Sequence, residues 1–288
     1  MASLVVLVGF DFRRVIDGVR YWHRFIPIEH IYLLYDRRKD TFGYASRRNT
    51  EDLHKVLSFA FHQPTKIGVN MQSYDDVFSI LYVVLKKETH EYSRDVYIDV
   101  TSTSKEAYGA TLVASLLFQR RVHPYIVPSS IPEWEVFRQE QIDFEEWFTK
   151  VRNIQGREPI EIFLPPVEPR LPDRNGERIL IVLLDHGGKA PSIKRLIEWC
   201  NEDPTDPVIK NRFSRIIRKL INEGLVISKA GSRNKPLHLT GFGFVLAKAL
   251  KKFRYYEEKQ RMLILKDIEL PPSTDSSLYL EEEPSFPA

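Results

Sequence analysis

Five short apolar runs, each separated from the next by a helical pattern, constrain the first 127 residues more than any other feature of the sequence. The runs are rich in β-branched and aromatic residues and lack a polar face, which is typical of strands buried on both sides. Strands that alternate with helices connect by right-handed crossovers and form a parallel sheet between two helical layers. We therefore predict a Rossmann-like, doubly wound α/β domain, with strands at Leu4–Val8, Ile31–Tyr35, Thr65–Val69, Val96–Val100 and Pro124–Val127.

The helical patterns between these runs are expected at about 14–25, 50–61, 73–87 and 104–118, with Thr50 and Ser73 as N-caps. Ligands of doubly wound sheets bind beyond the carboxyl ends of the strands. The loops expected to carry a binding site are therefore Gly9–Arg14, Asp36–Arg48, Asn70–Asp75 and Thr101–Lys105.

A connector is predicted after the last strand. Trp134–Val151 could form a helix, whereas Glu158–Pro172 holds five prolines and favours an extended spacer. We place the α/β domain at 1–130, the connector at 131–176, a C-terminal domain at 177–260 and a flexible tail at 261–288.

The charge of the chain is distributed unevenly. Its formal net charge is only +3, but the segment from Arg178 to Tyr256 holds 16 Lys and Arg against 6 Asp and Glu. That segment has a balance of +10, which leaves −7 for the rest of the chain. Such a separation suggests that the C-terminal region meets a polyanion and that the N-terminal region does not.

The basic segment has the element order of a winged helix-turn-helix. A first helix starts with Arg178–Leu184 and stops at His186-Gly187-Gly188, and Ser192 caps a second one at Ile193–Cys200. The third runs from about Val208 to Glu223 and ends at Gly224. Two short strands, Leu225–Ser228 and Leu237–Leu239, then flank a basic tip and complete a wing.

The third of these helices is predicted to enter the major groove of double-stranded DNA. Its apolar positions recur every three or four residues and form a stripe of Phe213, Ile216, Ile217, Leu220 and Ile221. Arginine and asparagine can read base edges, and lysine can meet phosphates. The predicted DNA-binding residues are Lys210, Asn211, Arg212, Arg215, Arg218 and Lys219 on the helix and Arg233 and Lys235 on the wing.

Two alternatives remain for this domain. The basic helix could be an ordinary solvated face, or the winged helix could mediate only protein contacts. The Ala- and Leu-rich helix at Phe242–Phe253 is a candidate dimer element, and a dimer would match a palindromic DNA site.

The segment Asp99–Tyr108, which reads DVTSTSKEAY, ends the fourth strand and opens a helix. Hydroxyls and backbone N–H groups at a helix N-terminus favour anions such as phosphate, and Lys105 adds a positive charge. The spacing is not that of a Walker P-loop, and Gly9-Phe10-Asp11 is not a dinucleotide fingerprint. The alternative is a Ser/Thr helix cap beside an exposed lysine.

Three motifs give the N-terminal region a family resemblance. They are Val8-Gly9-Phe10-Asp11, Asp99-Val100-Thr101-Ser102-Thr103-Ser104-Lys105 and Pro124-Tyr125-Ile126-Val127-Pro128. Over about residues 3–130 the chain resembles a CARF domain, the Rossmann-like sensor of CRISPR-associated antiviral proteins. A winged helix behind such a domain is similar to the Csa3-like arrangement of archaea and to the archaeal HFX_2341-type regulators.

The resemblance implies a homodimer with one composite pocket for a cyclic oligoadenylate, most often the tetramer. By position, Gly9, Phe10 and Asp11 would line the first loop, and Thr101, Ser102, Thr103, Ser104 and Lys105 would hold the phosphates. We add Arg13, Arg37 and Arg38 because they lie in basic strand-end loops, not because the family motif requires them. Ser102-Thr103-Ser104 replaces the usual glycine-rich form, so the backbone would approach a phosphate less closely.

The resemblance also raises a catalytic alternative, because some CARF proteins are ring nucleases that cleave their own ligand. Lys105 would then stabilise the charge that develops when a ribose 2′-hydroxyl attacks the phosphorus. Phe10 and Asp11 stand here in place of the small hydroxyl residue often found after the first strand. An aspartate at that place repels phosphate unless Arg13 or Arg14 pairs with it.

Several classes are disfavoured by the sequence. A single cysteine, Cys200, fits a reducing compartment, and no apolar stretch approaches the ~20 residues of a membrane span. The histidines lack metal-ligand spacing, so neither a metal nor a cofactor is expected besides the cyclic ligand. We therefore predict a cytoplasmic regulator whose CARF-like sensor controls DNA binding and transcription. The alternatives are a metal-independent ring nuclease and a module that recruits a protein.

Overall fold

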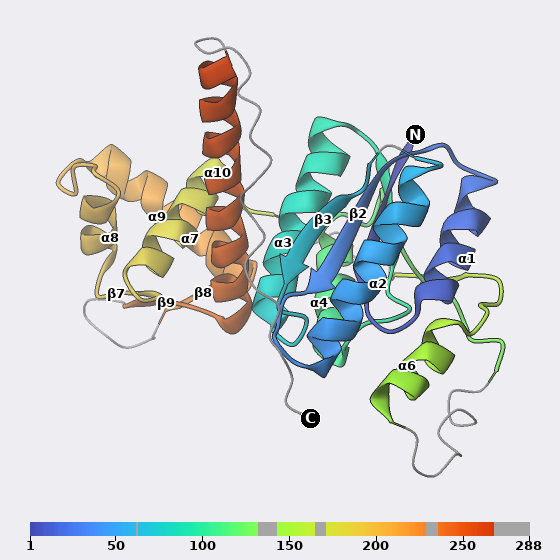
Figure 1. Cartoon of the computed structure of the whole chain (residues 1–288). Helices are drawn as coiled ribbons and strands as arrows, with labels where there is room; N and C mark the ends of the chain where they lie inside the picture. Colours follow the sequence, from blue (N-terminus) through green and yellow to red (C-terminus); the bar gives the residue numbers. More distant parts are fainter. Residues whose placement is uncertain (62, 132–142, 165–170, 229–235, 268–288) are drawn as a thin grey trace. The chain divides into compact units, whose positions relative to one another are not determined.

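The computed structural model describes residues 1–61, 63–131, 143–164, 171–228 and 236–267 (Figure 1). The predicted Rossmann-like sheet is confirmed. It contains β1 (Ala2–Val8), β2 (Ile28–Asp36), β3 (Thr65–Val69), β4 (Asp95–Asp99), β5 (Val122–Ile126) and β6 (Ile160–Glu161), in the order β3-β2-β1-β4-β5-β6. The first five are parallel to their neighbours, and β6 is antiparallel to β5.

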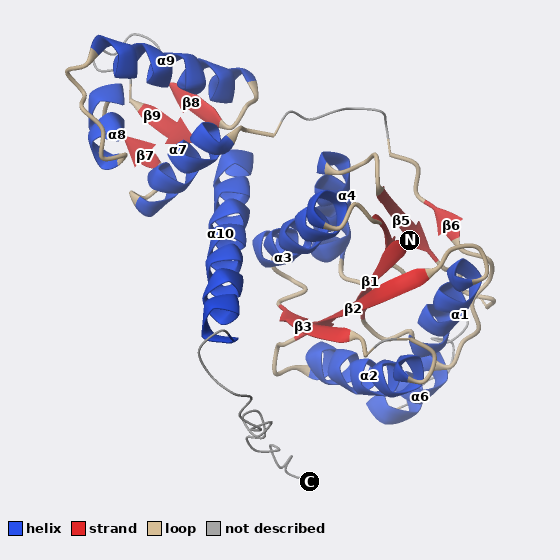
Figure 2. Cartoon of the chain, turned by 90° about the horizontal axis from the view of Figure 1, so that it is seen from above, coloured by secondary structure: helices blue, strands red, loops and turns tan. Residues whose placement is uncertain are grey.

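Helices cover both faces of this sheet (Figure 2). One face carries α1 (Phe12–His23), α2 (Thr41–Ser58) and α6 (Phe144–Arg152), and the other carries α3 (Tyr74–Lys86) and α4 (Lys105–Leu117). A short π-helix, Lys87–Glu91, follows α3. Every residue of β1 is buried, as a central strand between two helical layers requires.

The predicted start of the second helix is wrong. Its cap is Asp40, whose carboxylate accepts a hydrogen bond from the Gly43 N–H at 2.8 Å, and α2 is one and a half to two turns longer than expected. Thr50, the expected cap, is buried inside the helix and donates its hydroxyl to the carbonyl oxygen of Ser46 at 2.8 Å. The first turns of α2 pack through small residues rather than a large apolar stripe, so periodicity did not reveal them.

Part of the predicted connector packs on the α/β domain. Ile160 and Glu161 form β6 within the proline-rich segment that favoured a spacer, and α6 packs against α1. The predicted helix over Trp134–Val151 is seen as α6 from Phe144, while 132–142 lie outside the described residues. The boundaries at 130, 176 and 260 remain our proposal.

The C-terminal region has the predicted winged helix-turn-helix order. It comprises α7 (Arg174–Asp185), β7 (Lys189–Ala190), α8 (Ile193–Trp199), α9 (Pro207–Asn222), β8 (Val226–Ser228), β9 (Leu237–Leu239) and the start of α10 (Gly241–Asp267). The strands form an antiparallel sheet in the order β7-β9-β8, and the two-residue β7 was too short to predict. Gly187, Gly188 and Gly224 adopt φ values of +73°, +77° and +69° where α7 and α9 end.

Two sequence predictions fall outside the described residues. They are the wing tip at 229–235, which carries Arg233 and Lys235, and residues 268–288 of the tail predicted at 261–288. The first seven residues of that predicted tail are the last seven of α10, which ends at Asp267. None of the helices in the described ranges is long and apolar enough to cross a membrane.

Candidate functional site

The strand order reverses between β1 and β4, so the loops after these strands meet at the topological switch point of the sheet. Gly9 approaches Ser102 so closely that no side chain fits between them. The backbone N–H of Asp11 donates to the Ser102 Oγ at 3.0 Å. The structure thus joins two of the motifs that carried the family resemblance.

The hydroxyl groups of the β4–α4 loop differ in their hydrogen-bond partners. The Oγ1 of Thr101 accepts from the Val127 N–H at 2.9 Å. Ser104 caps α4 by accepting from the Ala107 N–H at 3.1 Å, and it donates to the carbonyl oxygen of Met71. The Oγ1 of Thr103 is buried and has no hydrogen-bond partner among the described residues. Ser104 is therefore committed to the fold, whereas the Ser102 hydroxyl accepts from the Asp11 N–H and still has its own proton to donate.

Lys105 is the first residue of α4 and is exposed. Within the described ranges its ammonium group has no ion-pair or hydrogen-bond partner. The first turn of a helix concentrates unpaired N–H groups and a positive partial charge, which favours an anion there. This end of α4 therefore combines a fixed dipole with an exposed lysine charge, beside the carboxylate of Glu106 in the same first turn.

The three arginines that we added to the site are paired with carboxylates. Arg13 pairs with Asp17 at 3.3 Å, which turns it along α1. Arg37 pairs with Asp76 at 3.1 Å but remains 58% exposed. Each of these two arginines therefore offers less charge to a ligand than the sequence alone suggested.

Arg38 is the most strongly held of the three. Its guanidinium pairs with Asp36 at 2.6 Å and with Asp40 at 2.7 Å, and the hydrogen bonds to Asp36 raise the pKa of Arg38. This arrangement fixes the β2–α2 loop, so Arg38 acts first as a structural residue.

The aspartate of the first loop is neutralised. The sequence left open whether Arg13 or Arg14 pairs with Asp11, and the structure shows Arg14, at 2.5 Å from Nη2 to Oδ1. Arg14 also donates to the carbonyl oxygen of Val127 at 3.3 Å, which ties the end of β5 to the same loop. The carboxylate of Asp11 is thus offset by a buried cation.

The side chain of Phe10, in the first loop, packs on α2 and α6. Its ring packs edge-on against Phe42 of α2 and Trp147 of α6, with centroids 5.0 Å apart in both pairs. This aromatic contact fixes the backbone of the first loop from the side of α2 and α6.

Asn49 was not singled out from the sequence, and Asp99 was quoted there only as the first residue of a motif, with no role of its own. Asn49 is fully buried, and its Nδ2 donates to the carbonyl oxygens of Gly9 and Phe10 at 2.8 Å each. Asp99 accepts from the Thr101 N–H at 2.9 Å. Burial raises the pKa of Asp99 to about 6, although hydrogen bonds from Thr101 oppose the shift. Asn49 was missed because the predicted helix began at Thr50. A helix predicted from residue 41 would have placed Asn49 on the buried face of α2.

The polar and apolar residues of α9 lie on opposite faces of the helix. Phe213, Ile217 and Leu220 are buried on one side of α9. Asn211, Arg215 and Arg218 are exposed and recur at i, i+4 and i+7, which sets them on one stripe opposite the buried side. Within the described ranges neither arginine of this stripe has a carboxylate partner. We call these three residues the outer stripe.

The remaining basic residues of α9 lie differently. Arg212 forms an ion pair with Glu202, and Lys219 pairs with Asp173 at 3.4 Å. Lys210 is exposed near the start of the helix. Of the two basic residues predicted in the wing, the structure describes neither.

The N-terminal domain matches a known family. Residues 4–131 match the family model described as "HFX_2341_N:-like, N-terminal". A search of curated protein sequences gives no match to the chain.

Solved structures similar to this chain fall into two groups. Csm6 from Enterococcus italicus, bound to a cyclic hexa-2′-fluoro-hexa-dAMP, is 13% identical, with 77% of this chain and 53% of that chain covered and a TM-score of 0.41. Can2 from Sulfobacillus thermosulfidooxidans, in complex with cyclic tetra-adenylate, is 11% identical, with 93% and 68% covered and a TM-score of 0.33.

The other group contains the MarR family transcriptional regulator SPO1453 from Silicibacter pomeroyi DSS-3, which is 23% identical. The match covers 33% of this chain and 63% of that one, with a TM-score of 0.26. This chain thus spans less than two thirds of the regulator and of Csm6. Likeness at these TM-scores is too loose to support an inference about this chain. The family match stands apart from it and agrees with the resemblance read from the sequence: residues 4–131 are similar to the HFX_2341-like N-terminal family, and a winged helix-turn-helix follows them in this chain.

Proposed function

We propose that this chain is a cytoplasmic, homodimeric transcription regulator that binds cyclic tetraadenylate at the carboxyl edge of its α/β sheet and double-stranded DNA through α9. The observation that carries the proposal is the outer stripe of Asn211, Arg215 and Arg218. It places an amide and two guanidinium groups, neither with a carboxylate partner among the residues that the structure describes, on the face of α9 opposite the core. This is the face that a recognition helix turns toward base edges.

The sensor half of the proposal rests on the charge at the carboxyl edge. Cyclic tetraadenylate carries four phosphates, and Lys105 with the N-terminus of α4 supplies an exposed positive site next to Glu106. A ring with rotational symmetry matches two copies of one edge related by a two-fold axis. A homodimer would present two such lysines and two Ser102–Thr103 hydroxyl pairs.

The proposed response is a shift between two dimer arrangements. A ligand that binds one arrangement more tightly raises its population, and the separation of the two α9 helices would change with it. The ion pairs and hydrogen bonds that join the edge loops favour movement of this edge as a unit.

One experiment tests both the proposed ligand binding and the proposed DNA binding. The full chain is incubated with radiolabelled cyclic tetraadenylate, separated from free ligand by filtration, and then mixed with the DNA that lies upstream of its own gene. We expect retained intact ligand and a DNA mobility shift that weakens as salt rises and changes with ligand. Absence of a shift at low salt, with and without ligand, would refute the regulator.

The same incubation decides the enzyme alternative. Lys105 is exposed at the place where a ring nuclease would stabilise developing charge. Conversion of the ligand to linear products by wild-type protein, but not by Lys105→Ala, would establish cleavage. Intact ligand after prolonged incubation with excess protein would exclude it.

A further inference from the structure

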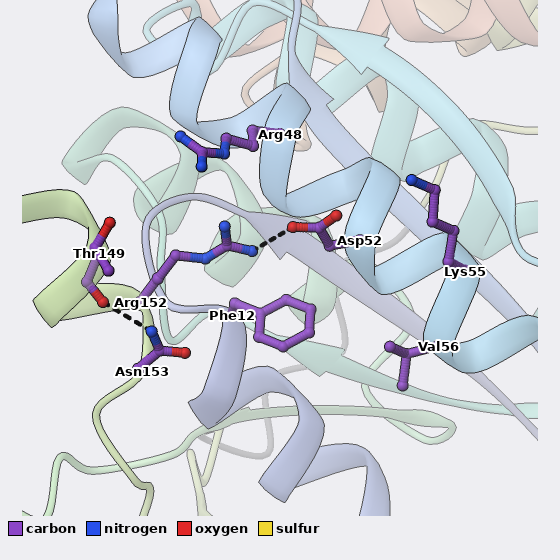
Figure 3. A pocket seen from close by; sticks show the side chains of 8 residues that line it. All are labelled: Phe12, Arg48, Asp52, Lys55, Val56, Thr149, Arg152 and Asn153. Carbon is purple, nitrogen blue, oxygen red and sulfur yellow. Dashed lines mark hydrogen bonds and ion pairs between the residues drawn. The ribbon is translucent and has the colours of Figure 1, made fainter. Parts of the chain in front are cut away.

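A second pocket lies between the start of α1, the second half of α2 and the end of α6 (Figure 3). Its volume is about 360 Å³, and none of the ligand-binding residues predicted at the carboxyl edge lines it, although Phe12 and Arg48 belong to the ranges given for the edge loops. The lining side chains are Phe12, Arg48, Asp52, Lys55, Val56, Thr149, Arg152 and Asn153.

Positive charge dominates this lining. Arg48, Lys55 and Arg152 line the pocket together with a single carboxylate, that of Asp52, toward which Arg152 points. Asp52 pairs with Arg152 at 2.5 Å. Glu145, outside the lining, pairs with Arg48 at 2.6 Å and takes up part of its charge. A positive excess remains in the pocket after both pairs are counted.

Lys55 supplies that excess. It is exposed, and the described part of the chain contains no ion-pair or hydrogen-bond partner for it. Thr149 adds an exposed hydroxyl, and the Nδ2 of Asn153 donates to the Thr149 carbonyl oxygen at 2.8 Å, which leaves the amide oxygen of Asn153 as an acceptor. The pocket therefore offers a cation, hydroxyl and amide groups to one ligand.

The pocket also has an apolar side. The guanidinium of Arg152 lies 5.1 Å from the ring centroid of Phe12, which holds both groups in place. Val56 is 44% exposed beside them, an unusual degree of exposure for an apolar residue in a concave site. A ligand with carbon atoms to bury would gain from covering Phe12 and Val56.

We propose that this pocket binds a small organic monophosphate, with the phosphate against Lys55 and the arginines and the carbon skeleton on Phe12 and Val56. Guanidinium and ammonium groups are the side chains that best hold phosphate. The volume lies near the lower end of the range for small-molecule sites, about 300–1,000 Å³, which suits a single nucleotide or sugar phosphate. The inference does not depend on the proposed function of the edge.

Isothermal titration calorimetry on the full chain tests this site with four probes: AMP, ribose 5-phosphate, inorganic phosphate and adenosine. We expect AMP or ribose 5-phosphate to bind at least ten-fold more tightly than either inorganic phosphate or adenosine. Equal affinity for inorganic phosphate would show that the apolar side is unused and would overturn the proposal. Binding of adenosine as tightly as AMP, or no binding of the phosphorylated probes at millimolar concentration, would overturn it as well.

Matched variants locate the binding. Lys55→Ala should weaken the phosphorylated probe about ten-fold, whereas Lys150→Ala, which removes the same charge from α6 outside the lining, should change it less than two-fold. Both positions are exposed, so neither variant should affect folding. Lys105→Ala should leave this binding intact, and Lys55→Ala should leave cyclic tetraadenylate binding intact. If Lys105→Ala abolishes binding of the probe and Lys55→Ala does not, the assigned pocket is wrong.

Discussion

A Cβ atom placed on Gly9 would lie 2.1 Å from the carbonyl oxygen of Ser102 and 2.6 Å from its Oγ. Both contacts are far inside van der Waals separation, and the nearer one is to backbone, which has little freedom to move. Gly9→Ala should therefore force the β1–α1 and β4–α4 loops apart. We expect the free energy of unfolding to fall by at least about 2 kcal/mol, as overpacked sites do.

Gly109 provides the control for this prediction. It lies within α4, and a Cβ there would meet nothing within 4 Å. Gly109→Ala should be neutral or raise the free energy of unfolding by up to ~1 kcal/mol, because alanine is the better helix former. Denaturant unfolding measures both variants, and similar stabilities for the two would contradict the close approach of Gly9 to Ser102.

The strands of the α/β domain were predictable because each is an apolar run between helical patterns. The Gly9–Ser102 contact was not, since it joins residues 93 positions apart and depends on how two loops leave the sheet. The start of α2 was missed for a different reason: its buried residues there are Gly43, Ala45 and Ser46, and small residues produce no hydrophobic periodicity.

For the candidate sites, sequence identified residue types but not their pairing. Lys105 was chosen from the family motif and Arg37 and Arg38 from their place in strand-end loops, but the sequence did not show which of them pairs with a carboxylate. Only the three-dimensional arrangement shows that carboxylates hold Arg37 and Arg38 and none holds Lys105 within the described ranges. The same holds for α9. Arg212 pairs with Glu202, which lies ten residues away in the sequence, whereas Arg215 has no such partner among the described residues.

Asp99 should give the domain a recognisable dependence on pH. Its pKa is about 6 in the fold, mainly through burial, against 3.8 for an unburied aspartate. Below pH ~4 the group is protonated in both states. Between pH ~4 and ~6 it ionises only in the unfolded state, so stability falls as pH rises, and the loss is complete above the folded pKa. A shift of about two units corresponds to roughly 3 kcal/mol.

Asp99→Asn should remove this dependence while keeping an oxygen that accepts from the Thr101 N–H. The variant should match the wild type near pH 4 and be more stable by about 2–3 kcal/mol near pH 7.5. Urea titrations across this pH range measure the difference, and a constant difference between wild type and Asp99→Asn would contradict the shifted pKa.

Lys105 and Arg13 should contribute unequally to ligand affinity at the carboxyl edge. Lys105→Ala removes an exposed charge with no described partner, and a homodimer would lose two. We expect its affinity for cyclic tetraadenylate to fall at least ten-fold, which corresponds to about 1.4 kcal/mol. Arg13→Ala should cost less than three-fold because Asp17 already neutralises that arginine. Equilibrium filtration with labelled ligand compares them, and equal losses would show that the ion pair opens on binding.

Substitutions in the outer stripe of α9 should weaken DNA binding more than substitutions of Arg212 and Lys219, which are already paired with carboxylates. Arg215→Ala and Arg218→Ala each remove a guanidinium that faces away from the core without an ion-pair partner among the described residues, and each should weaken specific binding by about 1–3 kcal/mol. Arg212→Ala and Lys219→Ala remove groups already held by Glu202 and Asp173, so each should cost only a few tenths of that binding free energy.

All four variants lower the positive charge equally, and all four positions are exposed, so a difference between the pairs reports position rather than net charge or folding. Mobility shifts at several salt concentrations provide the measurement. If the outer stripe reads bases, its variants should narrow the gap between specific and random DNA, whereas loss of a phosphate contact would weaken both alike and reduce the salt slope by about 1. Equal effects of the four substitutions at every salt concentration would mean that α9 acts only as a diffuse positive surface.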